Sequence, residues 1–152
     1  MTDEDYLSQA VALADANVRE AGGRPFGAVV VKGGQVIATG VNEIGATGDP
    51  TAHAELTAMR KAAQVLGTPR LDGCVVYASG QPCPMCLAAM HMTGVAAARF
   101  AYSNAQGEPF GLSTAAVYVE MTKPLEAQAL DVRHTPMGDP AIYRAWKGLA
   151  QS

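Results

Sequence analysis

The sequence predicts an α/β fold in which a mixed β-sheet lies between layers of α-helices. Two apolar runs, 26–31 and 35–42, flank Gly33-Gly34, and this pattern is typical of a β-hairpin. Helical and strand patterns then alternate along the chain, as they do where helices cover both faces of a sheet. The 152 residues contain no linker or repeat. We therefore expect a single domain over residues 1–152.

Each element of this fold has its own signal. The segment 3–21 alternates apolar and polar residues at helical spacing and stops at a Gly-Gly pair. The segment 51–66 is rich in Ala, Leu, Met, Lys and Gln, which favour a helix. A helix is also expected from Pro84, because proline is common at the first helical position. Apolar strands are predicted over 73–79 and 95–102.

The last third of the chain gives weaker signals. Gly, Pro, Ser and Asn predict a loop that runs to about residue 113. The segment 115–132 is compatible with a turn of helix and a strand. A closing helix is expected over 140–149, with Tyr143 and Trp146 on one side.

Composition restricts the function classes. Hydrophobic residues make up 49% and charged residues 16% of the chain, as in a compact globular domain. The net charge of −3 argues against a large basic surface for RNA or DNA, so no nucleic-acid partner is expected. No apolar run of ~18 residues predicts a membrane span, and the acidic start does not resemble a signal peptide. The three cysteines suit a reducing cytoplasm. Apolar helix faces on so small a domain favour a homodimer.

The most informative motif pairs His53-Ala54-Glu55 with Cys83 and Cys86, thirty positions further on. One imidazole and two thiolates suit Zn²⁺ and leave its fourth tetrahedral position open. A water bound there has its pKa lowered to about 7, which gives hydroxide at neutral pH. We expect one Zn²⁺ per chain with a bound water or hydroxide. Glu55 would then move protons without being a ligand.

Local geometry supports this interpretation, and two other interpretations of the cysteines are weaker. Cys83 and Cys86 are three residues apart and project to one face of the helix that begins near Pro84. A redox pair would leave the His-x-Glu motif unexplained. A closed structural zinc site would need a fourth ligand, and the other His and Cys residues of the chain are Cys74, His91 and His134. A catalytic zinc site is therefore favoured.

Several stretches resemble one known family: Arg24-Pro25-Phe26-Gly27-Ala28-Val29-Val30, Asn42, Thr51 to Arg60, Pro82 to Met90, and Tyr143-Arg144-Ala145-Trp146. Together they resemble the cytidine deaminase superfamily of zinc-dependent nucleobase deaminases, and within it the bacterial guanine deaminases. The resemblance covers essentially the whole chain. It implies a three-layer α/β/α sandwich with a five-stranded mixed sheet.

The resemblance also implies a reaction. His53, Cys83 and Cys86 would hold zinc, and zinc-bound hydroxide would attack the aminated ring carbon of a free nucleobase. Glu55 would be the proton shuttle. The best single guess for the substrate is guanine, which would give xanthine and ammonia.

Further residues acquire expected roles in substrate binding from the same resemblance. Asn42 would donate a hydrogen bond to a ring carbonyl, although Asn is also common in turns at strand ends. Phe26 would stack on the base, although a buried strand aromatic would look the same in sequence. The backbone carbonyl of Gln81 would accept a hydrogen bond from the leaving amine. Tyr143 and Trp146 lie in the segment that resembles the family's C-terminal part.

One departure from the family bears on the substrate. Guanine deaminases carry an acidic residue shortly after the equivalent of Phe110, whereas this chain has Gly, Leu, Ser and Thr at 111–114. A charge-assisted hydrogen bond worth about 1.5–3 kcal/mol would be lost. Glu108, on the other side of Phe110, is a candidate replacement, and both Glu108 and Phe110 are expected to bind the substrate.

The departure leaves other substrates and other classes of protein open. Cytosine, isoguanine or an aminotriazine could replace guanine. A tRNA adenosine deaminase shares the zinc motif, but its grip on RNA needs basic side chains, and here 11 Lys and Arg face 14 Asp and Glu. A non-catalytic zinc scaffold is disfavoured because Glu55 is present.

Overall fold

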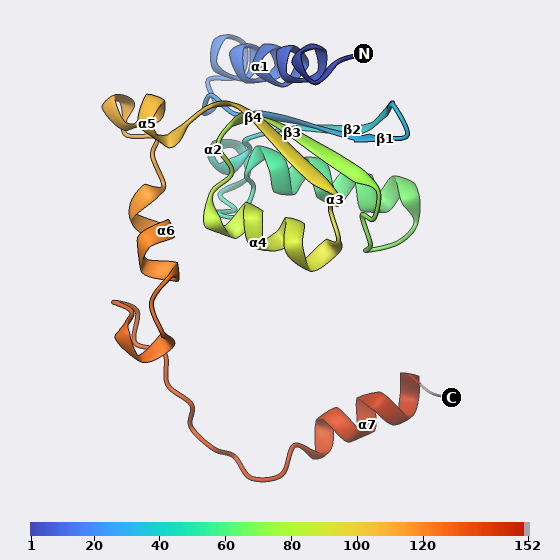
Figure 1. Cartoon of the computed structure of the whole chain (residues 1–152), viewed down its shortest axis with the longest axis vertical. Helices are drawn as coiled ribbons and strands as arrows, with labels where there is room; N and C mark the ends of the chain where they lie inside the picture. The colour runs from blue at the N-terminus through green and yellow to red at the C-terminus, as the bar shows by residue number, and fades with distance from the viewer. Residues whose placement is uncertain (151–152) are drawn as a thin grey trace. The chain divides into compact units, whose positions relative to one another are not determined.

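The computed structural model describes residues 1–150, which fall into two compact units, each described by itself below (Figure 1). The first unit is Met1–Val119, and the second begins at Glu120. No described helix is long and apolar enough to cross a membrane. The prediction of a single domain over residues 1–152 stays a prediction.

The first unit is built on a four-stranded mixed sheet, as the hairpin and the alternating pattern predicted. Its strands are β1 (Gly27–Lys32), β2 (Gln35–Val41), β3 (Cys74–Gly80) and β4 (Ala97–Tyr102), in the order β2-β1-β3-β4. Strand β1 runs antiparallel to β2 and β3, and β3 runs parallel to β4. The carboxyl ends of β3 and β4 therefore lie at the same edge of the sheet.

Helices cover both faces of this sheet. Helix α1 (Asp3–Arg19) lies on one face, and α3 (Ala54–Leu66) and α4 (Pro84–Thr93) lie on the other (Figure 1). The side chains of β1 alternate between the two layers, as a strand's period of two requires. Ala28 and Val30 pack in the core under α3 and α4, whereas Val29 and Val31 pack with α1. The predicted three-layer α/β/α arrangement is confirmed.

Two details of the prediction were wrong. The expected fifth strand is absent from the described residues, because the segment 115–132 forms α6 (Ala115–Met121) and the 3-10 helix η2 (Leu125–Ala127) instead. Pro124, which lacks an amide hydrogen, directly precedes η2 and could not donate to a strand ladder. The predicted loop that runs to about residue 113 also contains two short helices, α5 (Asn104–Gly107) and the 3-10 helix η1 (Glu108–Phe110). A further short helix, α2 (Ile44–Thr47), lies between β2 and α3.

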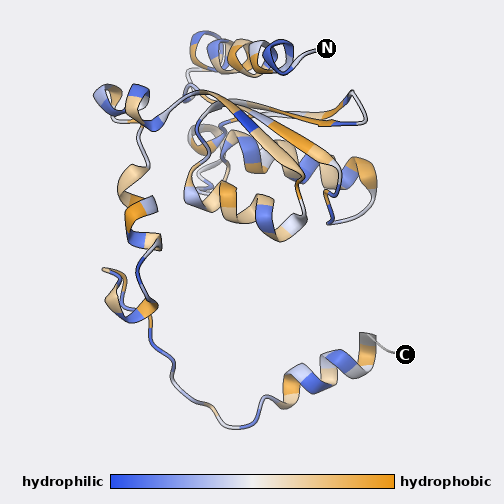
Figure 2. Ribbon diagram, viewed as in Figure 1, coloured by the Kyte–Doolittle hydropathy of each residue, from blue (hydrophilic) through white to orange (hydrophobic). Residues whose placement is uncertain are grey.

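The second unit contains η2 and α7 (Ala141–Ala150), which confirms the expected closing helix. The apolar side chains of Ile142, Tyr143 and Trp146 are exposed within this unit. Figure 2 shows hydrophobic and hydrophilic residues interspersed along α7. Such a helix has an apolar side available for packing.

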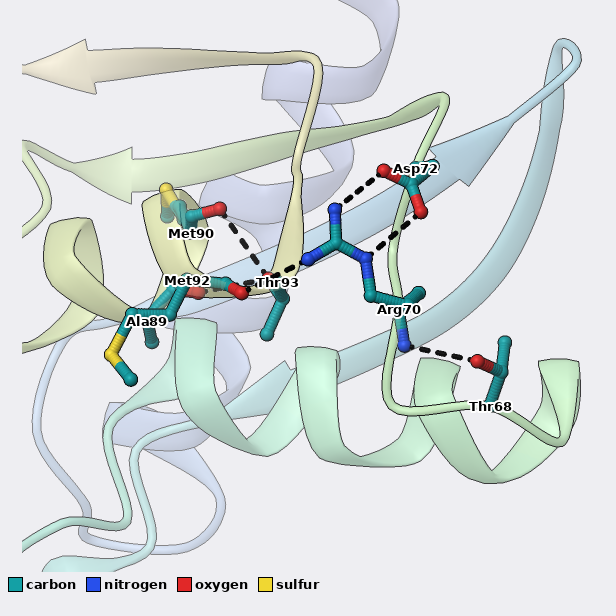
Figure 3. Close-up of polar contacts among 7 residues, drawn as sticks. All are labelled: Thr68, Arg70, Asp72, Ala89, Met90, Met92 and Thr93. Atoms are coloured by element: carbon teal, nitrogen blue, oxygen red, sulfur yellow. Dashed lines mark hydrogen bonds and ion pairs between the residues drawn. The ribbon is translucent and has the colours of Figure 1, made fainter. Parts of the chain in front are cut away.

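The C-terminal ends of α3 and α4 are joined through Arg70, which follows α3 (Figure 3). Its Nη1 atom donates to the backbone carbonyl of Met92 at 3.2 Å, while Nε and Nη2 donate to the carboxylate of Asp72 at 3.1 and 2.8 Å. The next residue, Leu71, is fully buried and donates its backbone N–H to Thr93. These contacts fix the mutual position of the two helices.

Candidate zinc-dependent active site

Helix α3 places His53 and Glu55 at the sheet. His53 is the N-cap residue, with extended φ and ψ of −70° and 153°, and Glu55 lies in the first turn. The helix approaches β2 closely because β2 has a glycine where they touch. A Cβ atom on Gly40 would lie 2.6 Å from the carbonyl oxygen of Ala54 and 2.6 Å from the amide nitrogen of Ala58. Glycine is thus required for this contact.

Helix α4 supplies the two cysteines in the same way. Cys83 is its N-cap residue, Pro84 follows at the first helical position, and Cys86 lies in the first turn. The Nδ1 atom of His53 lies 3.4 Å from the Sγ atom of Cys83 and 3.5 Å from that of Cys86, and the two sulfurs are 3.5 Å apart. Ligands at ordinary Zn–N and Zn–S distances in a tetrahedron are separated by about 3.6–3.8 Å. The donor set therefore fits Zn²⁺ in kind and in spacing.

The electrostatics of this group also suit a cation. The contact with the Sγ atom of Cys86 and the contact with His53 hold the pKa of Cys83 well below its usual value. The same sulfur–sulfur contact and burial raise the pKa of Cys86. A lowered pKa at Cys83 favours the thiolate form, which is the form that binds a metal ion.

Glu55 is buried, with 5% of its surface exposed. Burial raises the pKa of its carboxyl group above the ordinary value, since desolvation disfavours the charged form. A carboxyl group with a raised pKa is suited both to take and to return a proton near neutral pH. Because Glu55 lies beside the three donor atoms, its carboxyl group is placed to exchange protons with groups bound at the donor set.

A cavity of about 390 Å³ opens onto these residues. This volume lies within the usual range for small-molecule sites, about 300–1,000 Å³. Its lining is formed by Arg24, Phe26, Asn42, His53, Ala54, Glu55, Gln81, Cys83, Gly111, Leu112, Ser113 and Thr114. The cavity thus brings together the proposed metal group, Glu55 and three of the residues predicted to bind substrate: Asn42, Phe26 and Gln81.

Asn42 is buried at the end of β2. Its side-chain oxygen accepts a hydrogen bond from the amide of Ile44 at 3.1 Å. Because the oxygen is used in this way, the NH2 group of the same amide is left as a donor on a residue that lines the cavity.

Two other predicted substrate residues of the first unit, Phe110 and Glu108, do not line this cavity. Phe110 is 76% exposed and lines a separate apolar cavity of about 580 Å³ in the same unit, and Glu108 lines neither cavity. Tyr143 and Trp146 belong to the second unit. A role in substrate binding stays a prediction for all four residues.

Sequence reasoning missed several residues that shape the site. The side-chain oxygen of Gln81 accepts a hydrogen bond from the backbone N–H of Asn104 at 2.9 Å. The side-chain oxygen of Asn104 accepts one from the backbone N–H of Thr114 at 3.2 Å. This relay holds the segment 111–114 against the cavity. Tyr118 donates to the carbonyl of Pro82, next to Cys83. These contacts join residues that are 10 to 36 positions apart in the sequence, so no local sequence pattern predicts them.

Arg24 also lines the cavity and was not predicted as a site residue. Arg24 directly precedes Pro25 and Phe26, in a stretch that resembles the family. Its closeness in sequence to Phe26, a predicted substrate-binding residue, was the one signal that could have identified it.

Comparison with known proteins gives a consistent picture. Residues 1–102 match the model of the cytidine and deoxycytidylate deaminase zinc-binding region. The chain is 39% identical over 151 residues to the guanine deaminase of Bacillus subtilis (strain 168), covering 99% of this chain and 97% of that protein. It is 40% identical over 86 residues to the tRNA-specific adenosine deaminase of Aquifex aeolicus, covering 56% and 57% of the two chains.

Solved structures agree with these relatives. The X-ray structure of guanine deaminase from Bacillus subtilis superimposes with a TM-score of 0.92 at 38% identity, over 100% of this chain and 98% of the other. A guanine deaminase structure from Nitrosomonas europaea gives a TM-score of 0.69 at 30% identity, over 74% and 65%.

Proposed function

The chain belongs to the cytidine and deoxycytidylate deaminase family, and on that premise we propose that it converts guanine and water to xanthine and ammonia. The chain is a zinc-dependent nucleobase deaminase, and hence a hydrolase. One observation carries the proposal furthest. A buried carboxyl group, Glu55, shares one cavity with a His-Cys-Cys donor set and with the Asn42 amide.

The donor set assigns the metal ligands. His53, Cys83 and Cys86 would hold Zn²⁺, since their donor atoms lie within 4.8 Å of one another. When bound, Zn²⁺ supplies a hydroxide nucleophile at neutral pH. Arg70 supports the ligands indirectly, because it joins the far ends of the two helices that carry them.

Glu55 carries the proton transfers. Its carboxylate first takes the proton released from water and gives it to a ring nitrogen. It then takes the proton of the new C2 hydroxyl group, as the C2 carbonyl forms, and gives that proton to the departing amine. The C2–N2 bond of guanine breaks and a C2 carbonyl forms, while ammonia leaves with the nitrogen. One carboxyl group serves all of these transfers because it lies beside both the donor set and the space for the ring.

The remaining lining residues hold the base. Asn42 donates its amide to the ring carbonyl of guanine, and Phe26 provides a face on which the ring stacks. The backbone carbonyl of Gln81 accepts from the leaving amine. Fixed dipoles of this kind stabilise developing charge without reorganisation.

The assembly and the location of the protein complete the proposal. Exposed apolar side chains on α7 support a homodimer, which light scattering of the purified protein tests directly. The three free cysteines support a cytoplasmic location.

Ammonia release by the zinc-loaded protein tests the substrate. The panel is guanine, adenine, cytosine, isoguanine, 2-aminopurine, ammeline and their nucleosides. We expect turnover of guanine. A second candidate, another aminated ring, is favoured by the absence of a carboxylate from the segment 111–114 that lines the cavity. Turnover of such a ring with guanine inert would replace the first proposal with the second.

A further inference from the structure

Arg24 is the lining residue to which neither the family pattern nor the proposed chemistry gives a role. Arg24 lines the same cavity as Asn42 and Glu55, and the residue is exposed. Among the residues that the structure describes, no hydrogen bond or ion pair engages its guanidinium group. A residue of the cavity lining thus has five N–H donors available.

The backbone of Arg24 is held in place by Asn17, a buried residue of α1 with 7% of its surface exposed. The Nδ2 atom of Asn17 donates to the carbonyl of Arg24 at 2.8 Å and to the carbonyl of Asn42 at 3.0 Å. One amide therefore ties these two residues together, although 18 positions separate them. A Cβ atom on Gly23 would lie 2.5 Å from the same Nδ2 atom, so the approach depends on glycine.

Two neighbouring residues of the lining are hydrogen-bond donors, and the described part of the lining contains a single carboxylate. Asn42 offers its NH2 group, and Arg24 offers its guanidinium group. Glu55 is the one carboxylate among the lining residues of the described structure, and it is occupied with the reaction. Such a lining distinguishes rings by their acceptors.

Guanine has two adjacent acceptors, O6 and N7, on the edge of the ring opposite the reacting C2 carbon. A guanidinium group matches this pair with two parallel hydrogen bonds. With C2 at the donor set and Glu55, the O6–N7 edge points away from them, and Arg24 and Asn42 are two neighbouring donors of the lining that can bind this edge.

We propose that Arg24 is a specificity-determining residue that reads the O6–N7 edge of the purine, with Asn42 sharing O6. The inference rests on the proposed function, because it takes the ring to be an oxopurine. It explains how the site holds guanine without an acidic residue at 111–114: the base is recognised by its acceptors instead of its N–H donors.

The test compares guanine with 7-deazaguanine, which keeps the C2 amine and O6 but lacks the N7 acceptor. The ratio of kcat/KM for the two bases is measured for the zinc-loaded native chain and for Arg24→Gln, Arg24→Lys and Arg60→Gln. Arg60 is an exposed arginine of the same unit that does not line the cavity. Intrinsic differences in ring reactivity cancel when the ratios are compared.

We expect the native ratio to favour guanine, and Arg24→Gln to lower that ratio by about 10- to 100-fold. Arg24→Lys should restore only part of it, since lysine keeps the charge but not the planar fork. Arg60→Gln should leave the ratio at its native value.

Binding gives a readout that does not depend on turnover. Calorimetry with zinc-loaded Glu55→Gln should show tighter binding of guanine than of 7-deazaguanine, and adding Arg24→Gln should remove most of the difference. Turnover of guanine with an unchanged ratio in Arg24→Gln would overturn the inference and leave the proposed function intact. If the native chain does not turn over guanine, both are wrong.

Discussion

The Nδ1 atom of His53 lies 3.4 Å from the Sγ atom of Cys83, although thirty residues separate them in the sequence. Each is the N-cap residue of a helix that packs on the same face of the sheet. The first turns of the two helices supply the other functional groups, Glu55 and Cys86. The site is thus assembled where two helices begin, and the positive ends of their dipoles favour the thiolate.

Replacing Glu55 with Gln should remove the proton shuttle while preserving the metal and the fold. Proton transfer by a positioned side chain is worth about 10²–10⁴ in rate, so kcat should fall by at least that factor. The measurement is single-substrate kinetics together with metal analysis. Glu20→Gln, at the exposed end of α1, is the control and should behave as the native chain does. Near-native turnover in Glu55→Gln would rule out the assigned role.

Replacing Cys83 with Ser should cost the metal and the stability that the metal provides. Binding to the folded state alone stabilises that state, so zinc should raise the Tm of the native chain. In Cys83→Ser, zinc should bind at less than one ion per chain and the increase in Tm should disappear. Cys74→Ala alters a buried cysteine of β3 outside the donor set, and it should still bind one zinc. Stoichiometric, equally tight zinc in Cys83→Ser would contradict the ligand assignment.

Replacing Gly40 with Ala should disturb the packing of α3 on β2. The new Cβ atom would lie 2.6 Å from backbone atoms of Ala54 and Ala58. Backbone atoms of a helix cannot move aside as the end of a flexible side chain can. We expect a loss of about 1–3 kcal/mol in the free energy of unfolding, measured with urea. Gly45→Ala, where a Cβ atom meets nothing within 4 Å, should be neutral or slightly stabilising. Equal effects of the two substitutions would show that the close approach is unimportant.

The raised pKa of Tyr77 predicts how the free energy of unfolding changes with pH in the alkaline range. Burial, and then the hydrogen bond that Tyr77 donates to Asp3 at 2.6 Å, raise the pKa of Tyr77 from 10.0 to about 12. Because the folded chain holds this proton more tightly than the unfolded chain, the contribution is complete below pH 10 and is lost as pH rises to 12. The native chain should lose roughly 2–3 kcal/mol from this group over that interval.

The comparison for this prediction is Tyr77→Phe, whose stability should fall less steeply between pH 10 and pH 12. Tyr102→Phe alters an exposed tyrosine of β4 and should keep the native slope. Parallel curves for the native chain and Tyr77→Phe would show that the phenol proton does not contribute.

The sequence predicted those parts of the structure that depend on local patterns. The apolar runs on either side of Gly33-Gly34 predicted the hairpin of β1 and β2, and local signals predicted helices that begin near residues 51 and 84. The spacing of the motif predicted the chemistry because zinc accepts few combinations of ligands.

What escaped prediction depends on contacts between distant segments. The amide of Asn17 that ties Arg24 to Asn42, and the relay from Gln81 through Asn104 to Thr114, exist only once the chain is folded. The absent fifth strand has a related cause, since strand propensity becomes a strand only beside a partner.

The most direct test of the account is the product balance of guanine with the zinc-loaded chain. Xanthine and ammonia are measured together, before and after zinc is removed with a chelator and then restored. The account predicts one xanthine and one ammonia per guanine, loss of both without zinc, and recovery with it. A chain that carries one zinc at His53, Cys83 and Cys86 and forms no xanthine from guanine would contradict the account.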